Sequence, residues 1–146
     1  MSEEECIFCS IAAGTIPATI IDEDEHTVAF MDINPWARGH ALVIPRTHAR
    51  DLHEIDPDAL ARVMASAQRI AARMIERLDC EGVTLWNSTG TAAGQVIFHV
   101  HVHLIPRYPA DGPVEIRPRE RADEDDLAAV AAQLTAAGTS SGEESA

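Results

Sequence analysis

The sequence predicts an α+β fold in which an antiparallel sheet of about five strands packs against one long helix. Five short segments rich in apolar and β-branched residues alternate with loops that contain Gly, Pro, Asn or Asp, a pattern typical of strands. One longer segment, from residue 57 to about residue 79, is apolar at every third or fourth position, which indicates an amphipathic helix. At 146 residues the chain is long enough for one domain with a sizeable core.

The first part of the chain predicts a short helix followed by three strands. Residues 6–13 form the helix, and Gly14 ends it because glycine readily adopts the left-handed conformation found at helix ends. The expected strands are residues 19–22, 27–31 and 41–44.

The long helix has a clear start, and two strands follow it. Asp56 is a good N-cap, Pro57 suits the first helical position and Asp58 adds an acid to the first turn. After the helix, residues 82–87 and 95–105 are expected to be strands joined by a glycine-containing loop.

The last forty residues differ in kind, and we expect three parts in the chain. The first is a domain over residues 1–107. The second is a C-terminal extension over residues 108–137, with an acid-capped helix from residue 123, which packs on the domain or on a dimer. The third is a small, polar and disordered tail over residues 138–146.

Charge and composition exclude several classes of partner. The formal net charge of -13 argues against a nucleic-acid or anionic-membrane surface, because both partners are themselves negative. The chain shows neither a signal peptide nor an apolar run of the roughly 20 residues that span a membrane, so a cytoplasmic protein is expected. In that reducing compartment Cys6 and Cys9, a C-x-x-C pair, are better interpreted as metal-binding or redox residues than as a disulfide.

Three histidines, His99, His101 and His103, alternate in a run that otherwise predicts a strand. Strand side chains alternate between faces, so the three rings are expected on one face, about 6.6 Å apart. Such a face suits a catalytic metal, or phosphoryl chemistry in which a neutral imidazole attacks phosphorus while its neighbours hold the oxygens. A solvated face with three tolerated polar residues is the remaining interpretation.

The loop before these histidines favours phosphate. Asn87, Gly90, Gly94 and Gln95 offer side-chain amides and the backbone amides of a flexible loop, and both kinds of donor can hold phosphate oxygens without a metal.

Together these residues resemble the histidine triad (HIT) family, whose signature is three histidines alternating with apolar residues. Here it stands as His99-Val-His101-Val-His103-Leu-Ile, after Gly94-Gln95 and before Pro106-Arg107. The resemblance extends over about residues 5–107 and includes segments 7–8, 16–18, 30–33, 39–40 and 43–48. It implies a HIT-like fold with a short N-terminal helix, and a homodimer whose sheets join. Trp36 and the C-terminal segment are the candidates for that interface, and the sequence does not decide between them.

The resemblance also implies nucleotide hydrolysis or transfer through a covalent nucleotidyl-histidine. His101 then attacks the α-phosphorus, while His103 binds phosphate oxygen. Asp32 accepts hydrogen bonds from the ribose hydroxyls, which suits a carboxylate with two oxygens. The remaining positions that match nucleotide-binding residues surround the phosphates (Asn87, Gly94, Gln95) or line an apolar slot for an adenine or guanine base (Phe8, Ile11, Ile16, Phe30, Ile33).

A structural zinc ion is implied as well, one per chain, with no organic cofactor. Two cysteines three residues apart can grip one zinc ion, and two distant histidines complete a tetrahedral set. Similar bacterial HIT proteins carry these residue types at Cys6, Cys9, His48 and His99, which leaves His101 and His103 for phosphate.

One departure bears on the substrate. Hint-type members place a serine after Gly-Gln that can assist the leaving group, but this chain has Val96. The sequence therefore leaves a phosphoramidate and a dinucleoside polyphosphate open as substrates, and it leaves open a nucleotide-binding regulator with vestigial hydrolysis or a metal-dependent hydrolase.

The other histidines receive minor roles. His26 is expected at the surface, the resemblance gives His40 a buried structural role, and His53 has no assignment.

Overall fold

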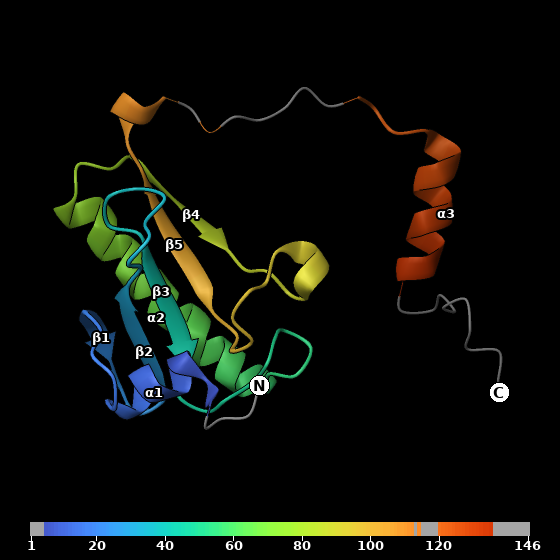
Figure 1. Ribbon diagram of the computed structural model, residues 1–146. Helices are drawn as coiled ribbons and strands as arrows, with labels where there is room; N and C mark the ends of the chain where they lie inside the picture. Colours follow the sequence, from blue (N-terminus) through green and yellow to red (C-terminus); the bar gives the residue numbers. More distant parts are fainter. Residues whose placement is uncertain (1–4, 113, 115–119, 136–146) are drawn as a thin grey trace. The chain divides into compact units, whose positions relative to one another are not determined.

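The computed structural model describes residues 5–112, 114 and 120–135 (Figure 1). The chain divides into two units, residues 1–113 and 114–146, and each is described by itself. The predicted tail, residues 138–146, lies outside the described residues. Among the described helices, none is long and apolar enough to cross a membrane.

The first unit is built on one antiparallel sheet of five strands, which confirms the predicted α+β fold. The strand order across the sheet is β1-β2-β3-β5-β4, so β5 lies between β3 and β4. The strands are β1 (Ile20–Glu23), β2 (Thr27–Met31), β3 (Ala41–Pro45), β4 (Gly82–Trp86) and β5 (Val102–Arg107).

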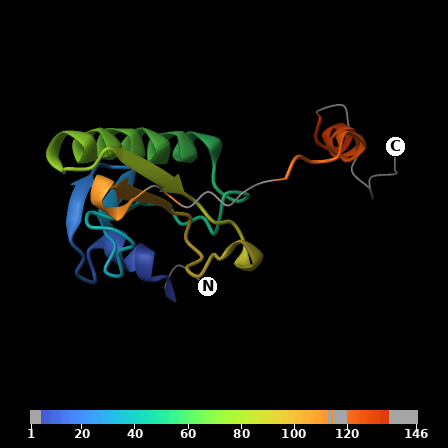
Figure 2. The ribbon, with the colours of Figure 1, turned by 90° about the horizontal axis from the view of Figure 1, so that it is seen from above.

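One face of the sheet is covered by α2 (Pro57–Arg77), which lies along it in both views (Figures 1 and 2). The Asp56 carboxylate accepts hydrogen bonds from the backbone N–H groups of Asp58 and Ala59, which confirms the predicted N-cap. Most of the predicted apolar stripe belongs to the main core, where four of its members are buried against β3 and β5 (Val63, Ala67, Ile70, Met74), whereas Met64 of the same stripe is exposed. Burial of Val63, Ile70 and Met74 contributes roughly 1.5–3 kcal/mol each.

A second, smaller core lies on the opposite face, where α1 (Ile7–Ala13) covers β2 and β3 (Figure 2). Cys6 caps this helix, and Gly14 ends it in the left-handed conformation with φ 75°, as predicted. The helix packs Phe8 against Phe30, with ring centroids 5.3 Å apart and nearly perpendicular planes. This face of the sheet carries the candidate site.

The predicted strand over residues 95–105 is wrong at its first half. β5 begins only at Val102, and residues 91–93 form a short 3-10 helix, η2. The Gln95 side chain holds the intervening loop, because it accepts from the Gly90 N–H and donates to the Ile97 carbonyl. Of the three histidines, only His103 therefore belongs to the sheet.

The second unit contains α3 (Glu124–Leu134), within the helix predicted over residues 123–137. The Asp123 carboxylate accepts from the backbone N–H of Asp126, as expected for an acidic N-cap. The packing of residues 108–137 on the domain or on a dimer stays a prediction.

Candidate functional site

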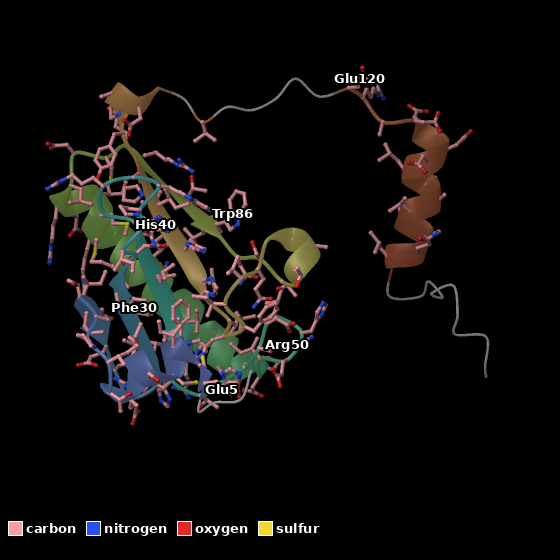
Figure 3. The ribbon with its side chains drawn as sticks, in the orientation of Figure 1. Glu5, Phe30, His40, Arg50, Trp86 and Glu120 are labelled. Atoms are coloured by element: carbon pink, nitrogen blue, oxygen red, sulfur yellow. The ribbon has the colours of Figure 1, made fainter. Side chains whose placement is uncertain are left out.

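The sheet register places one row of side chains across the face that α1 covers. Phe30 pairs with Leu42, Leu42 with His103, and His103 with Trp86. Directly opposed residues of antiparallel strands share a face, so the four side chains lie side by side. In Figure 3, Phe30 lies beside α1 and Trp86 on β4, at the two ends of this row.

A cavity of about 570 Å³ opens over this row, within the size range of small-molecule sites. Its lining includes ten residues that the sequence singled out: Phe8, Ile11, Ile16, Phe30, Asp32, Ile33, Gly94, Gln95, His101 and His103. The remaining predicted nucleotide-binding residue, Asn87, does not line it. Asn87 instead donates its side-chain N–H to the His101 carbonyl at 2.9 Å.

His101 presents one defined nitrogen to the cavity. Its Nδ1 lies 2.8 Å from the carbonyl oxygen of His99. Because a carbonyl only accepts, Nδ1 carries the proton and Nε2 keeps its lone pair. Burial lowers the pKa of His101, which keeps the ring neutral at physiological pH. A neutral imidazole with a free lone pair is a competent nucleophile.

His103 is oriented by His40, which lies 63 positions earlier in the chain. The Trp36 backbone N–H donates to His40 Nδ1 at 3.0 Å, so the neutral His40 ring carries its proton on Nε2. That Nε2–H donates to His103 Nδ1 at 2.8 Å, which leaves the His103 proton on Nε2. Burial, and after it the neighbouring His101 and His40 rings, lower the pKa of His103 to about 4.

His40 is buried, as the family resemblance implied, and it also has this direct contact with the triad. Asp32 lies next to the pair, with Oδ2 3.5 Å from His40 Nε2 and 3.9 Å from His103 Nδ1. The other Asp32 oxygen accepts from the Asn34 backbone N–H at 2.8 Å. Asp32, His40 and His103 also lie close enough to share a metal ion. However, the hydrogen bond between the two rings occupies the nitrogens that would bind the ion.

Two tryptophans that the sequence did not assign to the site line the same cavity. The Trp36 ring stacks on His103, with centroids 5.5 Å apart and planes 17° apart, and meets Trp86 edge-on at 5.7 Å. In the sequence, only the positions of the two tryptophans relative to other site residues could have pointed to this role. Trp36 stands four positions before His40, and Trp86 is the last residue of the strand that pairs with β5.

The glycine loop adopts the conformations that glycine allows, since Gly90 and Gly94 both have φ 90°. The Gln95 side chain is fully used within the protein: its amide N–H groups donate to the carbonyls of Arg50 and Ile97, and its oxygen accepts from Gly90. Gln95 thus shapes the loop beside the cavity and has no side-chain N–H to spare for a ligand.

Cys6, Cys9, His48 and His99 converge on the other side of the triad segment. Their ligand atoms all lie within 4.8 Å of one another. His99 Nδ1 is 3.4 Å from both Sγ atoms, and His48 Nδ1 is 3.2 Å from Cys9 Sγ. Tetrahedral zinc with ordinary bond lengths requires a separation of about 3.6 Å between sulfur and nitrogen ligands. The four predicted ligands therefore fit one zinc ion.

His99 is prepared for this cluster by the same device that prepares His101. Its Nε2 donates to the Pro45 carbonyl at 2.8 Å, which leaves the Nδ1 lone pair for a metal. The backbone carbonyl of His99 accepts the hydrogen bond from His101 Nδ1–H. Thus one residue joins the two sites. The remaining histidines stay outside both: His26 is half-exposed in the acidic turn, as expected, and His53 is exposed.

Comparison with known proteins identifies the family. A HIT domain model matches residues 13–110. An uncharacterised HIT-like protein from Methanocaldococcus jannaschii is 42% identical over 109 residues, 75% of this chain and 84% of that protein. The adenylylsulfatase HINT3 from Arabidopsis thaliana is 35% identical over 109 residues, 75% of this chain and 55% of that protein.

Solved structures agree with this match. The crystal structure of a Zn-bound histidine triad family protein from Mycobacterium smegmatis has a TM-score of 0.74 at 40% identity, and the match covers 82% of this chain and 87% of that one. The family model spans more than half of the chain and includes the triad segment. The chain therefore belongs to the HIT family.

Proposed function

We propose that the protein hydrolyses or transfers nucleoside 5′-phosphate derivatives at the α-phosphorus, through a nucleotidyl intermediate on His101. The observation that carries the proposal is the His101 ring, whose Nδ1–H is held by a backbone carbonyl and which lines the cavity with Nε2 free. The coarser statement, a nucleotide-binding or hydrolytic HIT protein, rests on the family and on relatives described as an adenylylsulfatase and as a histidine triad nucleotide-binding protein.

The cavity divides into parts that suit a nucleotide. Its apolar end, formed by Phe8, Ile11, Ile16 and Phe30 with the exposed Ile33, accepts the adenine or guanine base. Asp32 lines the same cavity, with Oδ2 3.9 Å from His103 Nδ1, and its carboxylate accepts hydrogen bonds from the ribose hydroxyls. The phosphate then lies at His101 and His103, beside the loop of Gly94.

The reaction proceeds in two steps. The His101 Nε2 lone pair attacks phosphorus and the leaving group departs; water then hydrolyses the phosphorus–nitrogen bond and releases the nucleoside monophosphate. His103 Nε2–H donates to a phosphate oxygen and stabilises the charge that grows there, while the hydrogen bond from His40 holds that proton in place. The Asn87 side-chain N–H donates to the backbone carbonyl of His101 and so fixes the backbone at this residue.

We further propose that Cys6, Cys9, His48 and His99 bind one structural zinc ion, supported by the fit of their ligand atoms and by the Zn-bound relative. A zinc ion bound in such a site stabilises the folded chain and crosslinks the segments that carry its ligands. Here the four residues join α1 to the segments before α2 and before β5. The homodimer and the cytoplasmic location stay predictions.

A substrate panel tests the proposed function. The purified protein is incubated with an adenosine phosphoramidate, diadenosine polyphosphates, adenosine phosphosulfate and a nucleotide sugar, and release of AMP is followed with and without EDTA. We expect EDTA-resistant turnover of at least one substrate, because the nucleophile is a histidine. Nucleotide binding without turnover of any of them would favour the regulator. Turnover that stops on chelation, while circular dichroism shows that the chain stays folded, would favour a metal-dependent hydrolase.

A further inference from the structure

We propose that the Ser88 hydroxyl protonates the leaving group, with Trp86 as its positioning residue, so that the site accepts substrates whose leaving group is an amine. The inference rests on the proposed function and adds the leaving-group class. An amine is expelled from phosphorus only if its nitrogen gains a proton as the bond breaks, because the bare amide anion is far too basic.

Val96, at the position next to Gln95, has no proton to give, although it lines the cavity and is 81% exposed. The nearby polar groups are already used. Both amide N–H groups of Gln95 are held by backbone carbonyls, and the indole N–H of Trp86 is held by Ser88. Any donor to the leaving atom must therefore come from elsewhere in the lining.

Only two hydroxyl groups occur among the described residues that line the cavity, those of Thr19 and Ser88. Thr19 directly precedes β1, and its carbonyl accepts from the Met31 N–H. It therefore belongs to the apolar end, away from the triad. Ser88 follows β4, two residues after the register partner of His103, and lines the same cavity as His101 and His103.

Two contacts hold Ser88 in place beside the catalytic histidines. Trp86, two residues earlier, is the register partner of His103. Asn87, directly before Ser88, is tied to the His101 carbonyl at 2.9 Å. Ser88 is thus connected to both histidines through the two residues that precede it.

The direction of one hydrogen bond gives Ser88 its role. Trp86 Nε1–H donates to Ser88 Oγ at 3.0 Å, because an indole nitrogen can only donate. Ser88 Oγ is therefore an acceptor in this bond and keeps its own proton for another partner. Within the part of the chain that the structure describes, no side chain or carbonyl accepts that proton, so it is available to water or to a ligand in the cavity that Ser88 lines.

The His101 Nε2 lone pair forms the nitrogen–phosphorus bond while the bond from phosphorus to the leaving nitrogen breaks. That bonding pair stays on the leaving nitrogen, which takes the Ser88 proton and departs as a neutral amine. Ser88 Oγ recovers a proton from water at the cavity mouth, and the Trp86 N–H stabilises the negative charge on Oγ during the transfer.

The test compares leaving groups that need a proton with one that does not. Wild type and Ser88→Ala are assayed with adenosine 5′-phosphoramidates of alkyl amines and with the p-nitrophenyl ester of AMP. General acid catalysis is worth about 10²–10⁴-fold, so we expect kcat for the amines to fall by about 10²-fold or more, with the ester changed by less than about threefold. Trp86→Phe, which keeps the ring but loses the N–H, should fall by a smaller factor on the amines alone.

Two further variants guard against a purely structural effect. Thr91→Ala removes an exposed hydroxyl from the same loop that does not line the cavity, and it should leave both substrate classes unchanged. Val96→Ser, added to Ser88→Ala, should restore part of the amine activity, because it returns a hydroxyl to the lining.

The outcomes separate cleanly. Selective loss on amines with rescue by Val96→Ser supports the role of Ser88. An equal loss on both substrate classes, or no loss, overturns it while leaving the proposed function intact. Absence of turnover by the wild-type protein on the ester and the amines alike overturns this inference, and inactivity on the whole substrate panel as well overturns the proposed function.

Discussion

His99 and His101 are two residues apart, yet the structure holds their rings in opposite tautomers. His99 gives Nε2–H to the Pro45 carbonyl and turns Nδ1 to two thiols. His101 gives Nδ1–H to the His99 carbonyl and keeps Nε2 for the cavity. The difference teaches that a backbone carbonyl, by taking one ring proton, decides which nitrogen remains for chemistry.

The surroundings of the two rings differ as much as their tautomers. His99 and Cys6 are 0% exposed, and the other two members of their cluster, Cys9 and His48, are half-buried, as expected of a structural metal site. His101 faces an open cavity with apolar walls, as expected of a group that must meet a ligand. Alternation along the chain supplies the imidazoles, and the folded environment divides them into two functions.

Replacement of His101 should have the largest effect. His101→Ala removes the nucleophile, so we expect kcat to fall by at least about 10⁴-fold while nucleotide affinity changes little. Turnover and fluorescence titration with AMP measure the two quantities, since Trp36 and Trp86 line the cavity. His53→Ala, at an exposed histidine outside both sites, is the matched control. Activity of His101→Ala comparable to wild type would contradict the covalent mechanism.

Cys9→Ser should disturb the proposed metal site at His99 and not the cavity at His101. Loss of a thiolate ligand should release the zinc ion and lower the free energy of unfolding by roughly 3 kcal/mol or more. Metal analysis of protein purified without chelator, together with chemical denaturation, measures both. Cys80→Ser is the control, because Cys80 is buried outside the cluster, where its thiol donates to the Met74 carbonyl. Equal and substoichiometric zinc in all three proteins would rule out the metal site.

Disturbing His40 should weaken catalysis less than removing the nucleophile. His40→Leu abolishes the hydrogen bond to His103 Nδ1, so the His103 proton loses its fixed position and we expect kcat to fall by about 10²-fold, with a smaller change in KM. His40→Gln retains an N–H donor and should recover part of this loss. Equal activity of the Leu and Gln variants would mean that His40 acts only by filling space.

The lowered pKa of His103 should appear as a pH dependence of stability. The pKa of this residue is about 4 in the folded chain and about 6.5 in the unfolded chain, so between these values the unfolded state binds more protons. The stabilisation that neutral His103 gives to the folded chain is therefore fully present above pH 6.5 and is lost as the pH falls toward 4. Urea unfolding at several pH values in this range gives the free energy of unfolding as a function of pH. This free energy should fall less steeply with decreasing pH for His103→Asn than for wild type, and equal pH dependence in the two proteins would contradict the lowered pKa.

The smallest effect is expected at the base slot. Ile33 is 91% exposed in the unliganded chain, so Ile33→Ala should change the free energy of unfolding by no more than about 0.5 kcal/mol. It should nevertheless raise KM several-fold, because the side chain lines the cavity where the base is proposed to bind. Unchanged KM for adenosine and guanosine substrates alike would place the base elsewhere.

Local rules predicted most of the fold. The capped start of α2 and the bounds of β2 follow from capping residues and from a run of β-branched and aromatic side chains, which act within a few residues of each other. The strand predicted from residue 95 failed because the alternating pattern continues through a segment that bends at residues 97–99 and lies outside the sheet. There the Val100 N–H donates to the Ala49 carbonyl, and Gln95 holds the loop.

The site was predictable where a motif encodes it and hidden where contacts are remote. The three histidines of the triad are close together in the sequence, and so are the two cysteines of the C-x-x-C pair, so each motif is visible by itself. The resemblance added His48 and Asp32 to them. No spacing rule links His40 to His103, which meet only because β3 pairs with β5. The orientation of Ser88 by Trp86 likewise depends on the side-chain geometry at the end of β4.

The covalent role of His101 is tested most directly by trapping the intermediate. The protein is mixed with an adenosine phosphoramidate, quenched within milliseconds in base, where a phosphorus–nitrogen bond to imidazole survives, and digested for peptide mass spectrometry. We predict one adenylyl group per modified chain, located on His101 and absent from His101→Ala. Adduct on His103 or His99, or active turnover with no adduct at any quench time, would contradict the assignment.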